Sequence, residues 1–288
     1  MAVLKRESDV MSKTLFRFVK QVASLAQKLT DAAVMQLSHP AGNGFAGWKH
    51  AVLLYLQEHM EAEYEEIIDW AAGMDRVRRV LGLRRGEFPA PSTLCKAFKR
   101  APMSVWRQLL RRSAELLAQN GHAAIDATYF DRQQASAQVD YLRRTGRSVR
   151  TIQTTFLVDT AEGAIIDLHC STKWPSGMRI GPKIALRNVG DLRTLAADKG
   201  YDDMSFREDL RAVGVRPLIK HRVFAPYDHA HNARVDDELY HQRSTSESVN
   251  SSIKRSHGSA VRARDWYRQF REIALIAGVH NIERAIDA

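Results

Sequence analysis

Hydrophobic positions in the first 118 residues recur every three or four positions. The clearest run comprises Leu15, Phe18, Val19, Val22, Leu25, Ala26 and Leu29. This spacing places the apolar side chains on one face of a helix and leaves the other face polar. The pattern also predicts a second helical region from Trp48 to Trp70, a short helix from Ser92 to Arg100 capped by Ser92, and a longer helix from Val105 to Leu117. The chain therefore begins with an all-α region.

After Asn120-Gly121 the pattern changes from helical to extended. A helix is predicted at 205–213, and strands are predicted at 122–130, 151–158, 164–170, 192–197 and 215–219. Residues 159–163 suit a hairpin between the second and third strands. Three antiparallel strands followed by alternating helices and strands is the order of a ribonuclease-H-like α/β fold. We therefore expect a mixed five-stranded sheet with flanking helices.

These patterns divide the chain into two parts. Residues 1–118 form the helical region, and residues 119–288 form the ribonuclease-H-like domain. An insertion is predicted at 222–239, between the fifth strand and the helix that follows it. Four residues of this insertion could bind zinc, namely His229, His231, Asp236 and Asp237. Two His residues at this spacing in a polar stretch more often belong to a loop.

Positive charge is concentrated in the helical region. The 288 residues carry a net charge of +10, and the stretch from Arg76 to Arg112 alone holds eleven basic residues and a single acid, Glu87. This charge favours a polyanionic partner, nucleic acid before an anionic membrane surface. The residues expected to contact DNA are Arg84, Arg85, Lys96, Lys99 and Arg100. The helices here could form a helix-turn-helix reader, or a basic surface that binds phosphates without reading sequence.

Composition excludes several classes of protein. No apolar run approaches the ~20 residues that a membrane span needs, and the longest candidate, Ile273 to Ile282, contains polar residues. Residues 1–7 lack the apolar core of a signal peptide. Cys95 and Cys170 are far apart in the sequence, so neither a disulfide framework nor a thiolate zinc site is indicated. We expect a soluble cytoplasmic protein that associates with the nucleoid and not with a membrane.

Two aspartates lie where a sheet could bring them together. Asp126 is inside the first predicted strand, and a charge in an apolar strand needs either a partner or a function. Asp198 ends the fourth predicted strand, where it could simply shape a turn. In a ribonuclease-H-like sheet the first and fourth strands are neighbours, so both carboxylates would lie at one edge. Proteins hold Mg²⁺ with a few such oxygens and leave positions open for water and phosphate.

The stretch from Tyr240 to Lys254 carries a third acid. As one helix it would bury Val249 and Ile253 and present along one stripe the residues Tyr240, Arg243, Glu247 and Lys254. An acid beside cations suits a site that holds a metal ion and a phosphate. The alternative is a capping box at residues 244–247. In that case Glu247 only satisfies a helix N-terminus, and Tyr240 and Arg243 precede the helix.

Three motifs together resemble one family. The spacing Tyr240-x2-Arg243-x3-Glu247-x6-Lys254 resembles the third-acid signature of insertion-sequence DDE transposases, most closely the group often called IS-four/IS-five. The run Asp198-Lys199-Gly200-Tyr201-Asp202 resembles the second-acid motif of that family, and Asp126 matches its first acid. The likeness extends from about Gly121 to the end of the chain, and residues 1–118 resemble the family's end-binding region only loosely. One departure is the stretch from Lys173 to Met178, where many relatives carry a His-Asp pair.

The resemblance implies a transposase that cleaves insertion-sequence ends and joins them to target DNA by phosphoryl transfer. Asp126, Asp198 and Glu247 would be catalytic and would bind two Mg²⁺ (or Mn²⁺) ions, with their carboxyl groups within roughly 8 Å of one another. Tyr240, Arg243 and Lys254 would contact DNA phosphates nearby. The partner would be double-stranded DNA, bound by a homodimer. The alternatives are an inactive transposase remnant that regulates by binding DNA, and a nuclease of the same fold without strand transfer.

Overall fold

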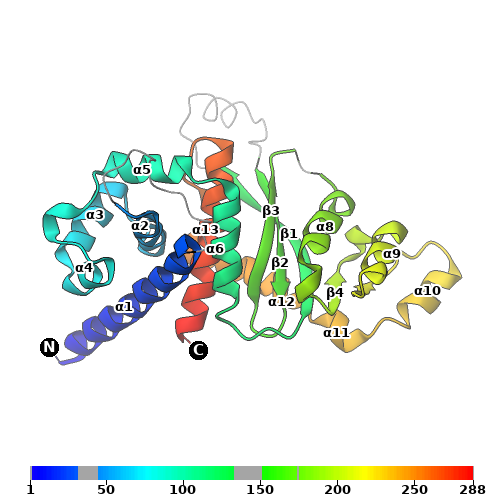
Figure 1. The fold of residues 1–288 in the computed structure, drawn as a ribbon. Helices are drawn as coiled ribbons and strands as arrows, with labels where there is room; N and C mark the ends of the chain where they lie inside the picture. The colour runs from blue at the N-terminus through cyan, green and yellow to red at the C-terminus, as the bar shows by residue number, and fades with distance from the viewer. Residues whose placement is uncertain (1, 32–44, 133–150, 174, 288) are drawn as a thin grey trace, which may run out of the picture. The chain divides into compact units, whose positions relative to one another are not determined.

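The chain divides into two units in the computed structural model, which describes residues 2–31, 45–132, 151–173 and 175–287 (Figure 1). One unit comprises residues 1–116 and 274–288, and the other comprises residues 117–273. The sequence pattern places the division after residue 118. It also assigns residues 274–288 to the second part, whereas in the structure they group with the first unit.

Helices build the described part of the first unit. They are α1 (Ala2–Asp31), α2 (Gly47–His59), α3 (Tyr64–Gly73), α4 (Asp75–Leu81), α5 (Pro91–Arg100) and α6 (Met103–Ala114), with the 3-10 turn η1 (Arg85–Glu87) and the end of α13 (Trp266–Asp287). The region predicted from Trp48 to Trp70 is two helices, because the chain turns at Glu61, which has a φ of 51°. Ser92 is not a cap, since α5 begins one residue earlier with Pro91, and proline suits the first helical position.

The apolar run near the C-terminus is a buried helix. Among the residues of α13 in the first unit, Ala274 to Ala277, Val279 and Ile282 are buried. Asn281 is also buried, and its Nδ2 donates to Ser113 Oγ at 3.0 Å. A helix that is apolar on most sides needs cover all round. None of the described helices is both long enough and apolar enough to cross a membrane.

A mixed sheet forms the centre of the second unit. Its strands are β1 (His122–Arg132), β2 (Ile152–Asp159), β3 (Ala164–Ser171), β4 (Thr194–Ala197) and β5 (Arg216–Ile219), in the order β3-β2-β1-β4-β5. β1, β2 and β3 are antiparallel, whereas β4 and β5 run parallel to β1. A two-residue strand, β6 (Ala260–Val261), also pairs with β1. The predicted ribonuclease-H-like order is therefore confirmed.

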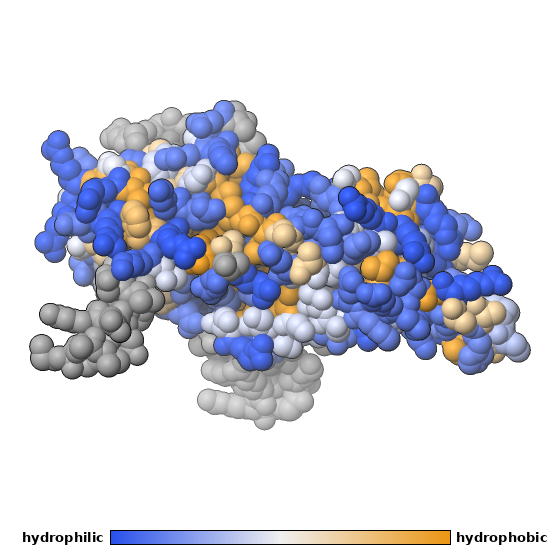
Figure 2. All heavy atoms as spheres, turned by 90° about the horizontal axis from the view of Figure 1, so that it is seen from below, coloured by the Kyte–Doolittle hydropathy of each residue, from blue (hydrophilic) through white to orange (hydrophobic). Residues whose placement is uncertain are grey.

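Alternate residues of the central strands face two layers. Ile125 and Ala197 belong to a hydrophobic core shared with α8 (Gly177–Ala185) and α9 (Met204–Ala212). Ala124 and Ala196 belong to a second core, which includes Tyr240 of α11 (Asp237–His241). Because side chains alternate along a strand, Asp126 shares the face of Ala124. α12 (Ser244–His257) packs against β1 and β2. The outer surface in Figure 2 is largely hydrophilic, with hydrophobic residues in separate patches.

Two short helices occupy the stretch predicted to be an insertion. α10 (Pro226–Asn232) is anchored by Asp228, which accepts hydrogen bonds from His221 Nδ1 at 2.8 Å, Phe224 N at 2.9 Å and Ala225 N at 2.8 Å. His231 stacks on His221 with the ring centroids 3.7 Å apart. Across the ranges that the structure describes, no three His, Cys, Asp or Glu residues form a group that could hold a metal ion. The structure therefore does not support zinc in this segment.

Candidate active site

Asp126 and Asp198 come from neighbouring strands, as the sequence predicts. β1 and β4 are parallel, with Ala124 opposite Ala196 and Ile125 opposite Ala197. Asp126 follows Ile125 and Asp198 follows Ala197, so the parallel register places the two aspartates next to each other on neighbouring chains. Asp126 lies within β1 and is partly buried, while Asp198 follows the end of β4 and is exposed. The shorter β4 thus opens the sheet to solvent at this point.

The turn after β4 fixes the direction of the Asp198 carboxylate. Asp198 caps the short 3-10 helix η3 (Lys199–Tyr201), and its Oδ1 accepts a hydrogen bond from Gly200 N at 2.8 Å. A Cβ on residue 200 would lie only 2.8 Å from that oxygen. Tyr201 is buried at the end of the turn, where its ring packs against Gly181 of α8. Asp198, Gly200 and Tyr201 therefore each have a local structural role.

We expect Gly200→Ala to slow any reaction that uses Asp198 while leaving the fold intact. The added methyl group would meet Asp198 Oδ1 at 2.8 Å and would displace the carboxylate from the position in which Gly200 N holds it. A displacement of about 1 Å at a reacting group can cost on the order of 10²-fold in rate. Gly190→Ala is the matched control, because a Cβ there meets nothing within 4 Å. DNA cleavage rates and melting temperatures of both variants test this, and an unchanged rate for Gly200→Ala would contradict it.

The helix that carries Glu247 begins after Tyr240, whereas the sequence pattern predicts one continuous helix from Tyr240 to Lys254. α12 starts at Ser244, and residues 242 and 243 form a turn between α11 and α12. Serine hydroxyls hold this turn, because Ser244 Oγ donates to His241 O at 2.9 Å and Ser246 Oγ donates to Arg243 O at 2.7 Å. The prediction of a single helix from Tyr240 to Lys254 is therefore wrong. The capping box is wrong too, since Arg243 is the cap residue and its side chain makes no capping bond.

Val249 and Ile253 anchor α12 as predicted. Both side chains are buried, with exposed fractions of 3% and 0%. Glu247 remains half exposed on the opposite side of the helix. There it forms an ion pair with Arg243, four residues earlier. The structure thus presents Glu247 together with a guanidinium rather than as an isolated carboxylate.

The sequence motif predicts that Tyr240 contacts DNA, but in the structure Tyr240 is part of the hydrophobic core. Its ring is 8% exposed and packs with Ala124, Ala196 and Leu218. The Lys220 ammonium lies 4.5 Å from the ring centroid, and the Arg243 guanidinium lies 5.8 Å from it. In this structure Tyr240 therefore supports two cations beside the site, while its own ring contacts the protein.

Asn250 is a site residue that the sequence motifs do not identify. Its Nδ2 donates to Asp126 Oδ2 at 3.0 Å and so joins α12 directly to β1. Asn250 lies three residues after Glu247 and four before Lys254, so the helical period alone places it on the same face. Lys254 is partly buried, and its Nζ lies 5.9 Å from the Phe130 ring of β1. Both residues thus sit over the strand that carries Asp126.

The charges of the site act on one another. Burial raises the pKa of Asp126, the nearby charges of Asp198 and Glu247 raise it further, and the Arg243 guanidinium opposes them. Burial also raises the pKa of Tyr201, and Asp126 and Asp198 add to this effect. The carboxylates of Asp198 and Glu247 therefore act on Asp126 as like charges. A cation between Asp126 and Asp198 would relieve the repulsion.

The donor set fits a hard divalent cation in part. Asp126 and Asp198 offer carboxylate oxygens from adjacent strands, and Mg²⁺ commonly takes one or two protein carboxylates and completes its shell with water and phosphate. The described residues contain no group of three ligating side chains close enough to hold a metal ion. The expected cluster of three carboxylates is thus not found among them, and Glu247 is paired with Arg243. Two carboxylates fit the ion, and the third faces a guanidinium.

The first unit presents the basic residues that the sequence singles out. In α5, Leu94 and Phe98 are buried, whereas Lys96, Lys99 and Arg100 are exposed, as predicted. Two residues, Ala101 and Pro102, separate α5 from α6. This pair of helices joined by a tight turn is compatible with either a helix-turn-helix or a basic phosphate-binding surface.

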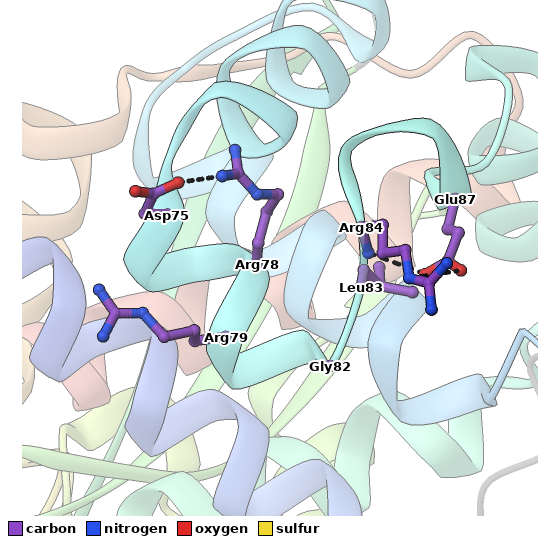
Figure 3. Close-up of a pocket in the computed structure, with 7 residues that line it drawn as sticks. All are labelled: Asp75, Arg78, Arg79, Gly82, Leu83, Arg84 and Glu87. Carbon is purple, nitrogen blue, oxygen red and sulfur yellow. Dashed lines mark hydrogen bonds and ion pairs between the residues drawn. The ribbon is translucent and has the colours of Figure 1, made fainter.

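A polar pocket of ≈ 700 Å³ lies beside α4 and η1 in the same unit (Figure 3). Arg78 pairs with Asp75, and Glu87 accepts a hydrogen bond from Arg84 N at 2.8 Å. The Arg79 guanidinium, by contrast, has no ion-pair partner among the residues drawn in Figure 3. Arg84 and Arg85 are exposed. The pocket therefore offers cations to solvent, as a phosphate contact requires.

A family model described as "Transposase DDE domain" matches residues 118–282. No curated protein matches the chain in sequence. A solved structure of the piggyBac transposase synaptic complex with hairpin DNA, determined by cryo-EM, is similar with a TM-score of 0.45 and 10% sequence identity. That match covers 93% of this chain and 72% of the piggyBac chain.

Proposed function

Because the chain belongs to the transposase DDE domain family, we propose that it is a transposase that cleaves the ends of an insertion sequence and joins them to target DNA. One observation carries the proposal. Asp126 within β1 and Asp198 directly after β4 lie next to each other on adjacent parallel chains, and the charges of Asp198 and Glu247 both act on Asp126. Acids that converge from distant parts of the sequence suit phosphoryl transfer to or from DNA.

The residues of the site would have three roles, which are metal binding, phosphate binding and positioning of a carboxylate. Asp126 and Asp198 would hold Mg²⁺ or Mn²⁺, with Glu247 as the third acid once Arg243 turns toward a phosphate. The bound ion would supply Lewis-acid activation of the phosphate and of the attacking oxygen. Arg243 and Lys254 would bind non-bridging oxygens of the DNA backbone. Asn250 would hold the Asp126 carboxylate in place through its 3.0 Å hydrogen bond.

DNA binding is assigned to the basic residues of the first unit. Lys96, Lys99 and Arg100 are exposed on one side of α5, and Arg84 and Arg85 follow α4. Each would neutralise a phosphate of the duplex, a contact that gives affinity without sequence preference. Two copies of the chain would bind the two element ends as a homodimer. This arrangement accounts for the concentration of positive charge between Arg76 and Arg112.

A second candidate function is that of a transposase remnant that binds DNA without cutting it. The ion pair between Glu247 and Arg243 favours this alternative, because it occupies the third acid. A nuclease without strand transfer is a third possibility on the same fold. The alternatives share the DNA-binding surface and differ only in chemistry.

A cleavage and joining assay tests the proposal. The protein is incubated with Mg²⁺ and DNA that carries the ends of its own element, and products are resolved on a denaturing gel. We expect nicks that expose 3′-hydroxyl groups at the element ends, followed by their joining to target DNA. Pre-cut ends that are never joined would indicate a nuclease, and an absence of nicking would leave the DNA-binding remnant.

A further inference from the structure

The residue that ends the second-acid motif, Asp202, is engaged through both carboxylate oxygens. Oδ1 forms an ion pair with the guanidinium of Arg207 in α9, and the Arg207 residue is only 6% exposed. Oδ2 accepts a hydrogen bond from the backbone N of Arg222 at 2.8 Å. Each oxygen of the Asp202 carboxylate therefore already has a partner within the protein.

Arg222 contacts the turn through two separate hydrogen bonds. While Arg222 N donates to Asp202, the Arg222 Nε donates to the backbone oxygen of Lys199 at 3.0 Å. Lys199 is the neighbour of Asp198 in the chain. The turn that carries the second acid is thus fastened at two points to the segment that follows β5.

This segment is itself firmly built. His221 N donates to Asn232 Oδ1 at 2.7 Å, and the buried Asp228 carboxylate accepts hydrogen bonds from His221, Phe224 and Ala225. From there the chain continues through α10 and α11 into α12, which carries Glu247. The Asp202 contacts therefore join the turn of the second acid to the segment that leads to the third.

We propose that Asp202 is a positioning residue, which fixes the turn bearing Asp198 against α9 and the segment that begins at Lys220. The inference rests on the proposed function, since it assigns Asp202 a role in placing a catalytic acid. Asp202 does not act on DNA itself. Burial acts to raise the pKa of Asp202, but the hydrogen bonds from Arg207 and Arg222 outweigh it and lower the pKa, so the carboxylate stays charged.

The isosteric variant Asp202→Asn removes this function with little change in volume. An amide has one oxygen and one NH₂ group, so in either orientation it presents a donor to Arg207 or to Arg222 N. One of the two contacts must then be lost. Mutation of a residue that orients a metal ligand without binding the metal typically costs 10–100-fold in activity or metal affinity. We expect single-turnover cleavage of bound DNA to slow by about this factor, with DNA affinity unchanged.

The contacts of Asp202 with Arg207 and Arg222, together with that of Arg222 with Lys199, are called the clamp below. Hydrogen–deuterium exchange tests whether this clamp exists, independently of activity. In the full-length Asp202→Asn protein we expect faster exchange in residues 198–203 and 220–225, with α13 unaffected. Asp209→Asn is the matched control, because Asp209 is an exposed acid of α9, the helix that carries Arg207. If Asp202→Asn does not fold, Arg222→Ala serves instead, since it removes the contact to Lys199 from an exposed side chain.

The two readouts separate the possible failures. Faster exchange together with slower cleavage at constant DNA affinity supports the positioning role. Unchanged exchange overturns the clamp, whatever the activity. Faster exchange with wild-type cleavage overturns the positioning role. If the wild-type protein does not cleave DNA, the proposed function fails and with it the role of Asp202 in catalysis, while the exchange data still decide whether the clamp exists.

Discussion

Glu247→Gln is expected to abolish DNA cleavage while DNA binding persists. Glutamine keeps the size and shape of glutamate but removes the charge that a divalent cation requires. Glu247 is half exposed on a helix anchored by Val249 and Ile253, so the substitution leaves the packing of α12 unchanged. Loss of a group that acts on the reacting atoms typically costs on the order of 10³-fold or more. Nicking rates and gel-shift affinities measured on the same DNA provide the test.

The matched control for this substitution is Glu238→Gln. Glu238 is an exposed acid of α11, and it loses the same charge in the variant. We expect it to cleave at the wild-type rate. If Glu247→Gln also cleaves at the wild-type rate, the role of Glu247 reduces to its ion pair with Arg243, and the catalytic assignment of the third acid is wrong.

Replacing Lys96, Lys99 and Arg100 together by alanine is expected to lower the salt dependence of DNA binding. Each side chain is exposed on α5, while the apolar face of that helix stays buried. The slope of log K against log salt should fall by roughly 0.9 for each phosphate contact that is lost, hence by about 2.7 if all three meet phosphates. Binding isotherms at several salt concentrations measure this slope.

An equal loss of charge elsewhere in the same unit distinguishes contact from net charge. Arg17, Lys20 and Lys28 are exposed on α1, and their triple alanine variant also removes three charges. Its slope should stay near the wild-type value. If the α5 variant also keeps the wild-type slope, DNA contacts the chain elsewhere. The stretch from Arg262 to Arg271, which contains four arginines, then becomes the first candidate.

Local patterns were sufficient to predict the sheet and the place of its two aspartates. Strand positions follow from short extended runs bounded by turn residues, and the ends of β1 and β4 agree closely with those runs. Once the strand order is known, the adjacency of Asp126 and Asp198 follows from register alone. The buried positions of α12 were equally predictable, because Val249 and Ile253 repeat at one helical turn.

Contacts between distant side chains were not predictable from such patterns. The break between α11 and α12 depends on serine hydroxyls that bind backbone oxygens of the preceding turn. Tyr240 is buried because the small side chains of Ala124 and Ala196 leave room for its ring on the sheet. Asn250 meets Asp126 across 124 positions of sequence. No local periodicity carries information of this kind.

Anomalous diffraction from Mn²⁺ in crystals of the protein bound to its DNA tests directly whether Asp126, Asp198 and Glu247 form a metal site. We expect an anomalous peak in contact with the carboxylates of Asp126 and Asp198, with Glu247 released from Arg243 and turned toward the ion. The same peak should be absent from the Asp126→Asn variant. An anomalous peak bound elsewhere, or a Glu247 that stays paired with Arg243 while DNA is cut, would contradict the assignment of these three acids as the catalytic centre.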